Sequence, residues 1–326
     1  MSSVAIIGAG GTIAMEGVHP FDWVDYGDSG IINPVDVVVS RMDLGLTDIA
    51  YRPEPFRMLP GTAMRASDWF ELQALVQRLN GDPEVRGIVI THGTATLEET
   101  AFFLRLTVDP QKSVVVTGAQ RPPNTASSDA VAGLRQAVAA AAKAPPGVYV
   151  VMNGNILCAD EARKTANHAL EAFVAPEFGP LGRVNPDASL YMRSRQRPAP
   201  KVFDISGIDP EKLARVDIVA SYVGADDVAI GAYVAAGARA IISTGFAPGR
   251  CAGQERPALV AAAAQGVLVV QSSHADRGYV PVQAYNRSVG IIGGGWLAPN
   301  KAKSLISLAI SSGLSPREIE DLLQQW

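Results

Sequence analysis

The amino-acid sequence predicts an α/β protein with a doubly wound, mainly parallel sheet. Short runs of β-branched residues alternate with helical patterns along the chain, as in strand–helix–strand units. Ala, Val and Gly dominate the composition, as in parallel sheets covered by helices on both faces. With 326 residues, the chain is long enough for two domains or for one large α/β domain. Crossovers between the parallel strands are expected to be right-handed.

The first half of the chain alternates predicted strands and helices. The strands are apolar and β-branched, and they are expected at 4–7, 51–59, 88–90, 113–117 and 148–152. The helices follow polar capping residues: Asn33 with Pro34 for a helix to about 42, Ser67 for one to 79, Thr96 with Glu99 as a capping box, and Ser127 or Ser128 for an alanine-rich helix to about 143.

The second half begins with an extended or hairpin segment at 156–164. The stretch 191–202 is rich in Arg and Pro and shows neither the hydrophobic period of a helix nor that of a strand. It is interpreted as part of a linker. After it, strands are expected at 216–220, 240–244 and 267–271 and helices at 228–236, 256–264, 300–311 and 315–325, with a polar loop after 271. The predicted organisation is an N-terminal catalytic domain at 1–192, a linker at 193–212 and a smaller α/β C-terminal domain at 213–326.

Charge and composition exclude several function classes. The net charge is −4 and no dense Lys/Arg stripe appears, so no nucleic-acid partner is expected. No apolar run approaches the roughly 20 residues that span a bilayer, and the first residues lack a basic segment typical of signal peptides. Cys158 and Cys251 lie far apart, which argues against a disulfide framework and suits a reducing compartment. A cytoplasmic protein without a membrane partner is expected.

Neither a metal nor a cofactor is expected. The four histidines are dispersed and show no metal-ligand spacing: His19, His92, His168 and His274. The glycine-rich turn after the first strand resembles a dinucleotide fingerprint, but Ile13 occupies the third glycine position and no acid follows at the required distance. A nucleotide-binding oxidoreductase is therefore the weakest alternative, and a turn that presents the Thr12 hydroxyl fits better.

The most informative stretch is 86–100, where a buried strand ends in a hydroxyl-rich turn and a helix follows. Thr91 and Thr94 would lie at the carboxyl end of that strand, beside a helix N-terminus, where anions and oxyanions are stabilised. Thr12 would lie next to Thr94 in the same sheet. A threonine is a poor nucleophile unless a base or a cation assists it, and Lys164 follows a later strand. The long loop 19–32 carries Tyr26, and two interpretations stay open: a lid, or a surface loop whose aromatic residues pack on the domain.

Five segments, in order along the chain, resemble bacterial-type L-asparaginases and glutaminase-asparaginases. They are GGTIA at 10–14, THGT at 91–94 with LEETA at 97–101, TGAQRP at 117–122, KT at 164–165 and FGPLG at 178–182. The resemblance implies a larger N-terminal α/β domain and a smaller C-terminal one. It also implies a homotetramer or homodimer in which the neighbouring C-terminal domain helps to close each site.

The resemblance also implies roles for individual residues. Thr12 resembles the family's nucleophile on a flexible loop, and Tyr26 the tyrosine that hydrogen-bonds to it. Thr94 and Lys164 resemble the second threonine and its lysine partner. Backbone N–H groups of the turn around Gly93 and Thr94 would stabilise the oxyanion of an amide substrate.

Four positions depart from the family pattern. Ala95 replaces the aspartate that binds the substrate's α-amino group, and Gly61, followed by Thr62, replaces a serine that holds the α-carboxylate. The segment 282–286 has no counterpart of a glutamate that also binds the amino group. Arg250 stands where the family has an asparagine.

These departures predict a small-molecule amide substrate without an α-amino group: a carboxamide, lactam or cyclic imide. Ala95 and Gly61 would enlarge the pocket, and Arg250 would pair with a distant carboxylate. Two alternatives stay open. One is an L-asparaginase in which another acid, such as Asp25 or Asp276, replaces the missing carboxylate. The other is an inactive binding protein on the same scaffold.

Overall fold

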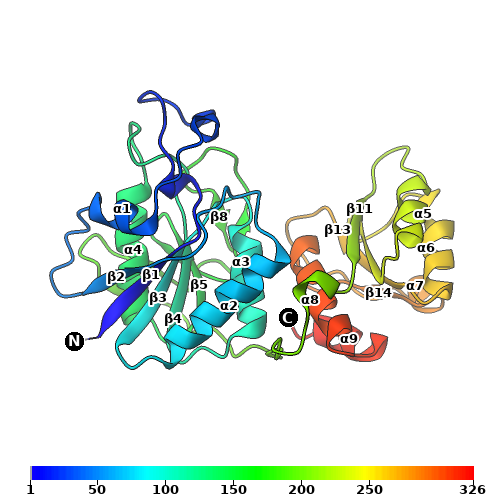
Figure 1. The fold of residues 1–326 in the computed structure, drawn as a ribbon. Helices are drawn as coiled ribbons and strands as arrows, with labels where there is room; N and C mark the ends of the chain where they lie inside the picture. Colours follow the sequence, from blue (N-terminus) through cyan, green and yellow to red (C-terminus); the bar gives the residue numbers. More distant parts are fainter. Residues whose placement is uncertain (1) are drawn as a thin grey trace. The chain divides into compact units, whose positions relative to one another are not determined.

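The computed structural model describes residues 2–326, which divide into two compact units. One unit ends at Pro198 and the other runs from Ala199 to Trp326, so the division falls inside the predicted linker 193–212. Each unit has its own main sheet, as Figure 1 shows. Two α/β sheets on one chain confirm the predicted fold class.

The N-terminal unit is built on an eight-stranded sheet with the order β10-β9-β6-β5-β4-β3-β1-β2. Its strands are β1 (Ser3–Gly8), β2 (Tyr51–Glu54), β3 (Val85–Thr91), β4 (Ser113–Thr117), β5 (Gly147–Met152), β6 (Asn155–Cys158), β9 (Gly182–Val184) and β10 (Leu190–Met192). From β2 to β5 the neighbouring strands run parallel, and β6, β9 and β10 add an antiparallel edge. The parallel part positions the ends of β1 and β3 side by side, with Gly8 paired to Thr91.

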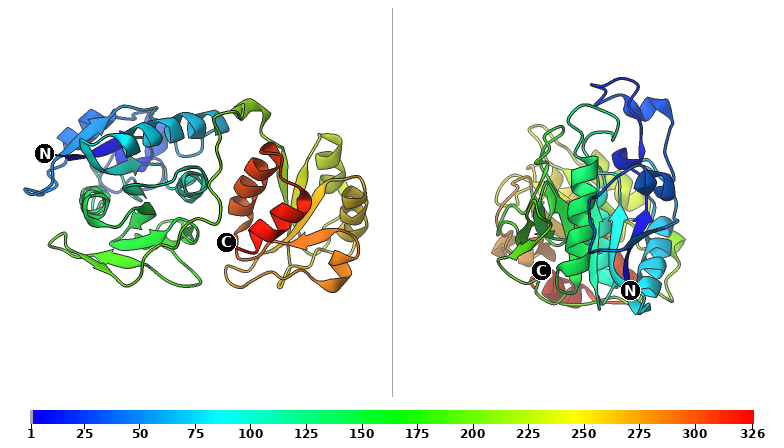
Figure 2. Two further views of the ribbon diagram at one scale, coloured as in Figure 1. Left: turned by 90° about the horizontal axis from the view of Figure 1, so that it is seen from below. Right: turned by 90° about the vertical axis from the view of Figure 1, so that its left-hand side faces the viewer.

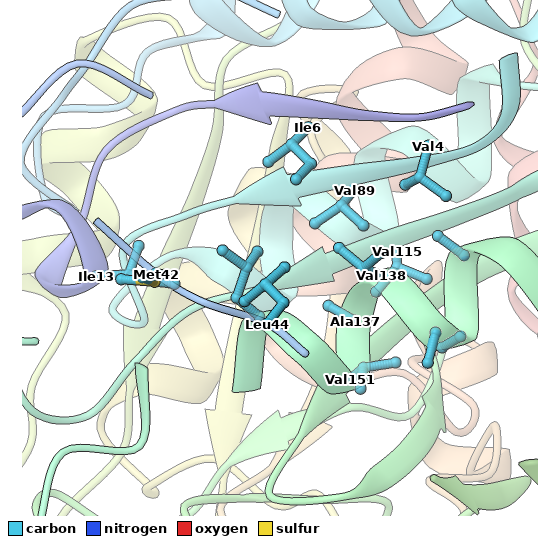
Figure 3. Packing of buried hydrophobic residues seen from close by; sticks show 14 of the residues in the cluster. Val4, Ile6, Ile13, Met42, Leu44, Val89, Val115, Ala137, Val138 and Val151 are labelled. Atoms are coloured by element: carbon cyan, nitrogen blue, oxygen red, sulfur yellow. The ribbon is translucent and has the colours of Figure 1, made fainter. Parts of the chain in front are cut away.

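Helices cover both faces of this sheet because alternate residues of each strand point to opposite sides. Val4 and Ile6 of β1 belong to a core cluster with α1 (Val35–Ser40) and α4 (Ala130–Lys143). Figure 3 shows this face, where Val4 and Ile6 pack in one layer with residues of β3, β4 and α4. Ala5 and Ile7 belong to a second cluster, with α2 (Ala66–Gly81) and α3 (Leu97–Thr107).

Two predicted side-chain caps do not form, because each side chain has a different partner. Thr96 precedes α3, but its hydroxyl donates to the Gly61 carbonyl at 2.7 Å, so the predicted capping box with Glu99 does not form. Asn33 lies before Pro34, the N-cap of α1, and its amide donates to the Ala14 carbonyl instead. Tertiary partners take these polar groups because a loop lies within reach.

Two further helix starts and one strand end also differ from the prediction. α2 begins at Ala66, and the Asp68 carboxylate accepts the Arg65 N–H at 2.9 Å, so Ser67 is not its cap. α4 begins at Ala130 rather than at Ser127 or Ser128. The strand predicted at 51–59 ends at Glu54.

A short hairpin in the N-terminal unit carries Lys164. β7 (Arg163–Lys164) pairs antiparallel with β8 (Phe173–Val174), with Lys164 opposite Phe173. The segment predicted as extended or hairpin at 156–164 therefore contains β6, which forms a hairpin with β5, and then β7.

The C-terminal unit holds a parallel four-stranded sheet in the order β11-β12-β13-β14. Its strands are β11 (Val216–Ala220), β12 (Ala240–Gly245), β13 (Leu268–Ser273) and β14 (Ile291–Gly293), and its α-helices are α5 (Val228–Ala235), α6 (Glu255–Ala264), α7 (Ala284–Arg287), α8 (Pro299–Ser311) and α9 (Pro316–Leu323). Figure 2 shows this sheet with its helices in two further views. The prediction of a polar loop after 271 is wrong, because α7 and β14 lie there and are too short to show a clear period. Among residues 2–326, no helix has the length and apolarity needed to cross a bilayer.

Candidate active site

Three glycines bring the loops of the candidate site into backbone contact. A Cβ on Gly93 would lie 2.2 Å from the Gly61 Cα, and a Cβ on Gly11 would lie 2.4 Å from the Gly93 Cα. Gly11 also has φ of 80°, which favours glycine. The turn after β1, the loop around Gly61 and the turn after β3 therefore meet where no side chain fits. This junction places Thr12 and Thr94, each next to one of these glycines, in adjacent loops.

Thr12 and Tyr26 form the first hydroxyl pair. Thr12 starts the 3-10 helix η1 (Thr12–Ala14) and is 6% exposed. Its Oγ1 lies 2.8 Å from the hydroxyl oxygen of Tyr26, and either group can donate. Tyr26 starts the 3-10 helix η2 (Tyr26–Ser29) in the predicted lid. The structure thus brings together two residues that the sequence paired.

Thr94 and Lys164 form the second pair. The Nζ of Lys164 donates to Thr94 Oγ1 at 2.8 Å, and the backbone N–H of Lys164 donates to Glu98 Oε2 at 2.5 Å. Burial lowers the pKa of the Lys164 amine, and the nearby Glu98 charge opposes this effect. A lowered pKa increases the fraction of neutral amine, which can accept a proton from a hydroxyl.

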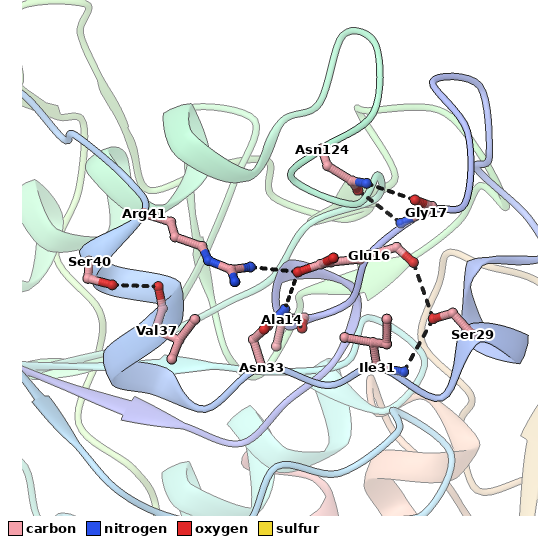
Figure 4. Close-up of polar contacts among 10 residues, drawn as sticks. All are labelled: Ala14, Glu16, Gly17, Ser29, Ile31, Asn33, Val37, Ser40, Arg41 and Asn124. Carbon is pink, nitrogen blue, oxygen red and sulfur yellow. Dashed lines mark hydrogen bonds and ion pairs between the residues drawn. The ribbon is translucent and has the colours of Figure 1, made fainter.

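The segment 16–31, which contains most of the loop predicted at 19–32 and is called the lid below, is held by contacts at its base. The Asn124 side chain donates to the Gly17 carbonyl at 2.7 Å and accepts the Gly17 N–H at 2.9 Å. Arg41 and Asn33 both donate to the Glu16 carboxylate, and Figure 4 shows these contacts around the lid's base. These bonds fix the base of the segment that carries Tyr26.

Two of the positions that depart from the family pattern, Gly61 and Ala95, lie at one place in the N-terminal unit. A Cβ on Gly61 would be 3.7 Å from the Cβ of Ala95, and Ala95 is exposed. Thr62 follows Gly61 in a turn closed by the bond from the Ala63 N–H to the Pro60 carbonyl. Gly61, Gly93 and Ala95 are therefore immediate neighbours, and two side chains that the family uses are missing from one spot.

Arg250 belongs to the C-terminal unit. Its guanidinium carbon lies 5.5 Å from the ring centroid of Tyr285, and the Arg256 guanidinium lies 4.9 Å from the same ring. Arg250 is exposed, as is Asp276 of the same unit. The roles considered for these two residues at the Thr12 site stay predictions.

The structure adds three residues that sequence reasoning left without a role. Glu98 binds the Lys164 backbone and could have been found as the acid one helical turn after Thr94. Thr100 and Trp69 form a chain with His92: the Trp69 indole N–H donates to Thr100 Oγ1 at 2.8 Å, and Thr100 Oγ1 lies 2.9 Å from His92 Nε2. No sequence signal indicated that chain. Within residues 2–326, no group of three or more His, Cys, Asp or Glu side chains is placed to hold a metal ion.

One hydroxyl pair and one hydroxyl–amine pair lie at the carboxyl edge of a parallel sheet, an arrangement suited to nucleophilic attack on a carbonyl carbon. The comparisons with known proteins agree. Residues 3–197 match the family model "Asparaginase, N-terminal", and residues 215–323 match "Glutaminase/Asparaginase C-terminal domain". The chain belongs to the asparaginase family of amidohydrolases.

Relatives of known description support this assignment over the full length. The chain is 34% identical to a glutaminase-asparaginase of Pseudomonas aeruginosa, covering 100% of this chain and 91% of the relative. It is 33% identical to L-asparaginase 2 of Escherichia coli, covering 100% and 94%. The crystal structure of a probable cytoplasmic L-asparaginase from Campylobacter jejuni superposes with a TM-score of 0.90 at 30% identity, covering 99% of each chain.

Proposed function

We propose that this protein hydrolyses a carboxamide, lactam or cyclic imide that lacks an α-amino group, with Thr12 as the nucleophile. The proposal rests on one observation. The Thr12–Tyr26 and Thr94–Lys164 pairs are both formed. Gly61 and Ala95, which are neighbours, replace the serine and the aspartate by which the family is expected to bind an amino acid. These contacts support a reaction like that of the family on a substrate that is not an α-amino acid.

The proposed reaction begins when the Thr12 hydroxyl attacks the carbonyl carbon and passes its proton toward Tyr26. The oxyanion of the tetrahedral intermediate accepts hydrogen bonds from backbone N–H groups of the turn around Gly93 and Thr94. Tyr26 gives its own proton to the substrate nitrogen as it receives the one from Thr12, and collapse breaks the carbon–nitrogen bond. The nitrogen departs as ammonia or an amine, or stays tethered as an amine or amide when the substrate is a lactam or a cyclic imide. Water, polarised by Thr94 and the neutral Lys164 amine, then hydrolyses the Thr12 ester and restores the hydroxyl.

The substrate class follows from charge. An ammonium group taken out of water without a carboxylate partner costs on the order of several kcal/mol. Ala95 offers no charge, and the neighbouring acid Glu98 already accepts the Lys164 N–H. Asparagine and glutamine should therefore bind poorly. Arg250, an exposed cation over Tyr285, would pair with a carboxylate at the far end of the substrate.

The test is hydrolysis of a panel of lactams, cyclic imides and simple carboxamides beside asparagine and glutamine, by the wild type and by Thr12→Ala. We expect turnover of at least one amide without an α-amino group and its loss in T12A. Asparagine turnover at ordinary enzyme rates would contradict the substrate class and favour the second candidate, an L-asparaginase, which the descriptions of the relatives support. Loss of turnover in T12A also excludes a protein that only binds.

Ala95→Asp is the matched gain-of-function variant. The position is exposed, so an added carboxylate should change stability by only about 0.5 kcal/mol or less. We expect A95D to gain activity toward asparagine and to lose activity toward the amide preferred by the wild type.

We also propose a homotetramer or homodimer in the cytoplasm. The Campylobacter jejuni structure is described as cytoplasmic, although a relative from Haemophilus influenzae is described as periplasmic. Cys158 and Cys251 are both free thiols in the structure, which suits a reducing compartment. Analytical ultracentrifugation and cell fractionation test the two parts of this proposal separately.

A further inference from the structure

We infer that His92 and Thr100 are positioning residues that fix the peptide group between Gly93 and Thr94 for catalysis. The inference rests on the proposed function, because it concerns the turn that would hold the oxyanion. The observation behind it is a chain of three hydrogen bonds that starts at Trp69 and ends on the Gly93 carbonyl.

The direction of every bond in this chain can be deduced. The Gly93 carbonyl only accepts, so His92 Nδ1, 2.9 Å away, must carry its proton. A neutral imidazole then has an unprotonated Nε2, which accepts the Thr100 O–H at 2.9 Å. The Trp69 indole N–H only donates, so the Thr100 oxygen accepts from it at 2.8 Å. Each group in the chain holds the next in one orientation.

The surroundings keep the imidazole neutral. His92 is 1% exposed and Thr100 is fully buried. Burial lowers the pKa of His92 from 6.5 to about 4. A single ring proton is therefore retained at neutral pH, and the chain keeps its direction there.

The end of the chain lies at the reacting turn. Gly93 has no Cβ to restrict its backbone, so its peptide group needs an external restraint. Its carbonyl accepts from His92 and, at 3.4 Å, from the Thr96 N–H. In a planar trans peptide the N–H points opposite to the C=O, so holding the carbonyl also aims the Thr94 N–H. Within residues 2–326, no backbone carbonyl pairs with that N–H, which leaves it available to an oxyanion.

The test compares valine substitutions at two buried threonines of α3. Thr100→Val removes the hydroxyl that orients His92. Thr107→Val removes a hydroxyl that donates only to the Phe103 carbonyl of its own helix, at 2.8 Å, and serves as the control. We expect T100V to lower kcat about 10- to 100-fold with little change in KM, because the turn is displaced while the substrate pocket remains. T107V should keep kcat within about twofold, because Thr107 ends α3 and lies at the opposite end of the helix from the turn around Gly93.

Two further variants separate positioning from stability. Thr100→Ser keeps the hydroxyl and should restore most of the lost kcat. Trp69→Phe keeps an aromatic ring against Phe103, 5.0 Å away in the wild type, but removes the first donor. It should lower the melting temperature, and it should lower kcat less than T100V does. Equal kcat losses in T100V and T107V, or no recovery in T100S, would overturn the inference.

A readout without turnover keeps the inference testable if no substrate is found. The ¹⁵N shifts of the His92 ring should show the Nδ1–H tautomer in the wild type and a mixture of tautomers in T100V. Crystal structures of T100V and T107V should show a rotated 93–94 peptide in the first alone. An unchanged tautomer and peptide in T100V would reject the inference, whereas a wild type that hydrolyses no amide would reject the proposed function.

Discussion

Lys164 shows how burial can favour the neutral form of a single amine. Its amine is half-buried, touches the Thr94 hydroxyl at 2.8 Å and lies near the Glu98 carboxylate. Burial favours the neutral amine and lowers the pKa of Lys164, and the Glu98 charge limits that effect. The pair resembles a hydroxyl with its own general base, which is what a second, water-activating step requires.

Lys164→Met should remove the base while keeping most of the side-chain volume. We expect kcat to fall about 100-fold or more, the usual contribution of a general base. In the wild type, activity should rise with pH and level off below 10.5, the ordinary lysine value, because only the neutral amine accepts a proton. The pH profile of kcat/KM for wild type and variant measures both. A variant with the wild-type rate would exclude Lys164 as the base.

His92 should make the protein sensitive to acid. Its folded pKa is about 4 and its ordinary value is 6.5, so below pH 6.5 the unfolded state binds a proton that the folded state does not. Stability is therefore lost as the pH falls from 6.5 to 4, by up to about 3 kcal/mol at roughly 1.4 kcal/mol per pKa unit. His92→Asn keeps a donor near the Nδ1 position but does not titrate. Urea unfolding at several pH values should show a shallower decline in H92N.

At the scale of elements, the lid depends on bonds at its base rather than on packing. Four of its large apolar side chains are exposed: Val18, Phe21, Val24 and Ile31. Trp23 makes the main ring contact with the rest of the unit, with the Arg121 guanidinium 4.0 Å from its centroid. Few apolar contacts and several polar ones are typical of a segment that opens locally.

Asn124→Ala should therefore loosen the lid and displace Tyr26 from Thr12. Two hydrogen bonds to the Gly17 backbone are lost, each worth roughly 1 kcal/mol, so kcat/KM should fall about tenfold as the closed state becomes less populated. Asn185→Ala is the control, because that side chain bonds only to Ser189 in an exposed turn. Equal effects of N124A and N185A on kcat/KM would show that the base of the lid does not control the site.

The sequence predicted the site through elements that have a strong local pattern. The apolar runs ending near Thr12 and Thr94 are long and clear, and parallel neighbours must meet at their carboxyl ends. The sequence does not reveal that the Asp68 carboxylate accepts the Arg65 N–H at the start of α2, or that the Thr96 hydroxyl donates to the Gly61 carbonyl before α3. The choice among such partners depends on the local geometry and on tertiary contacts. The His92–Thr100–Trp69 hydrogen-bond chain joins α2 to α3, and the hydrophobic periodicity of the two helices does not indicate it.

At the scale of the molecule, the residues predicted for the site belong to two units of the chain. The hydroxyl pairs and Lys164 lie before Pro198, whereas Arg250 lies after it. A substrate with an amide at one end and a carboxylate at the other would need both units. The resemblance to the family implies that the second unit comes from a neighbouring copy of the chain.

Arg250→Ala should raise KM for a carboxylated amide about 10- to 100-fold, the contribution of a charge-assisted hydrogen bond, and leave KM for its neutral analogue unchanged.

Co-expression of R250A with T12A then tests which copy supplies the arginine. If Arg250 serves a neighbour, the intact Thr12 of the R250A chain meets the intact Arg250 of the T12A chain, and activity returns. Co-expression of T12A with K164M is the control, because both lesions lie in the same unit and no site regains both groups. No recovery in the first pair despite mixed oligomers would show that each chain completes its own site. Recovery in the control pair would show that the assay does not report residues shared between copies.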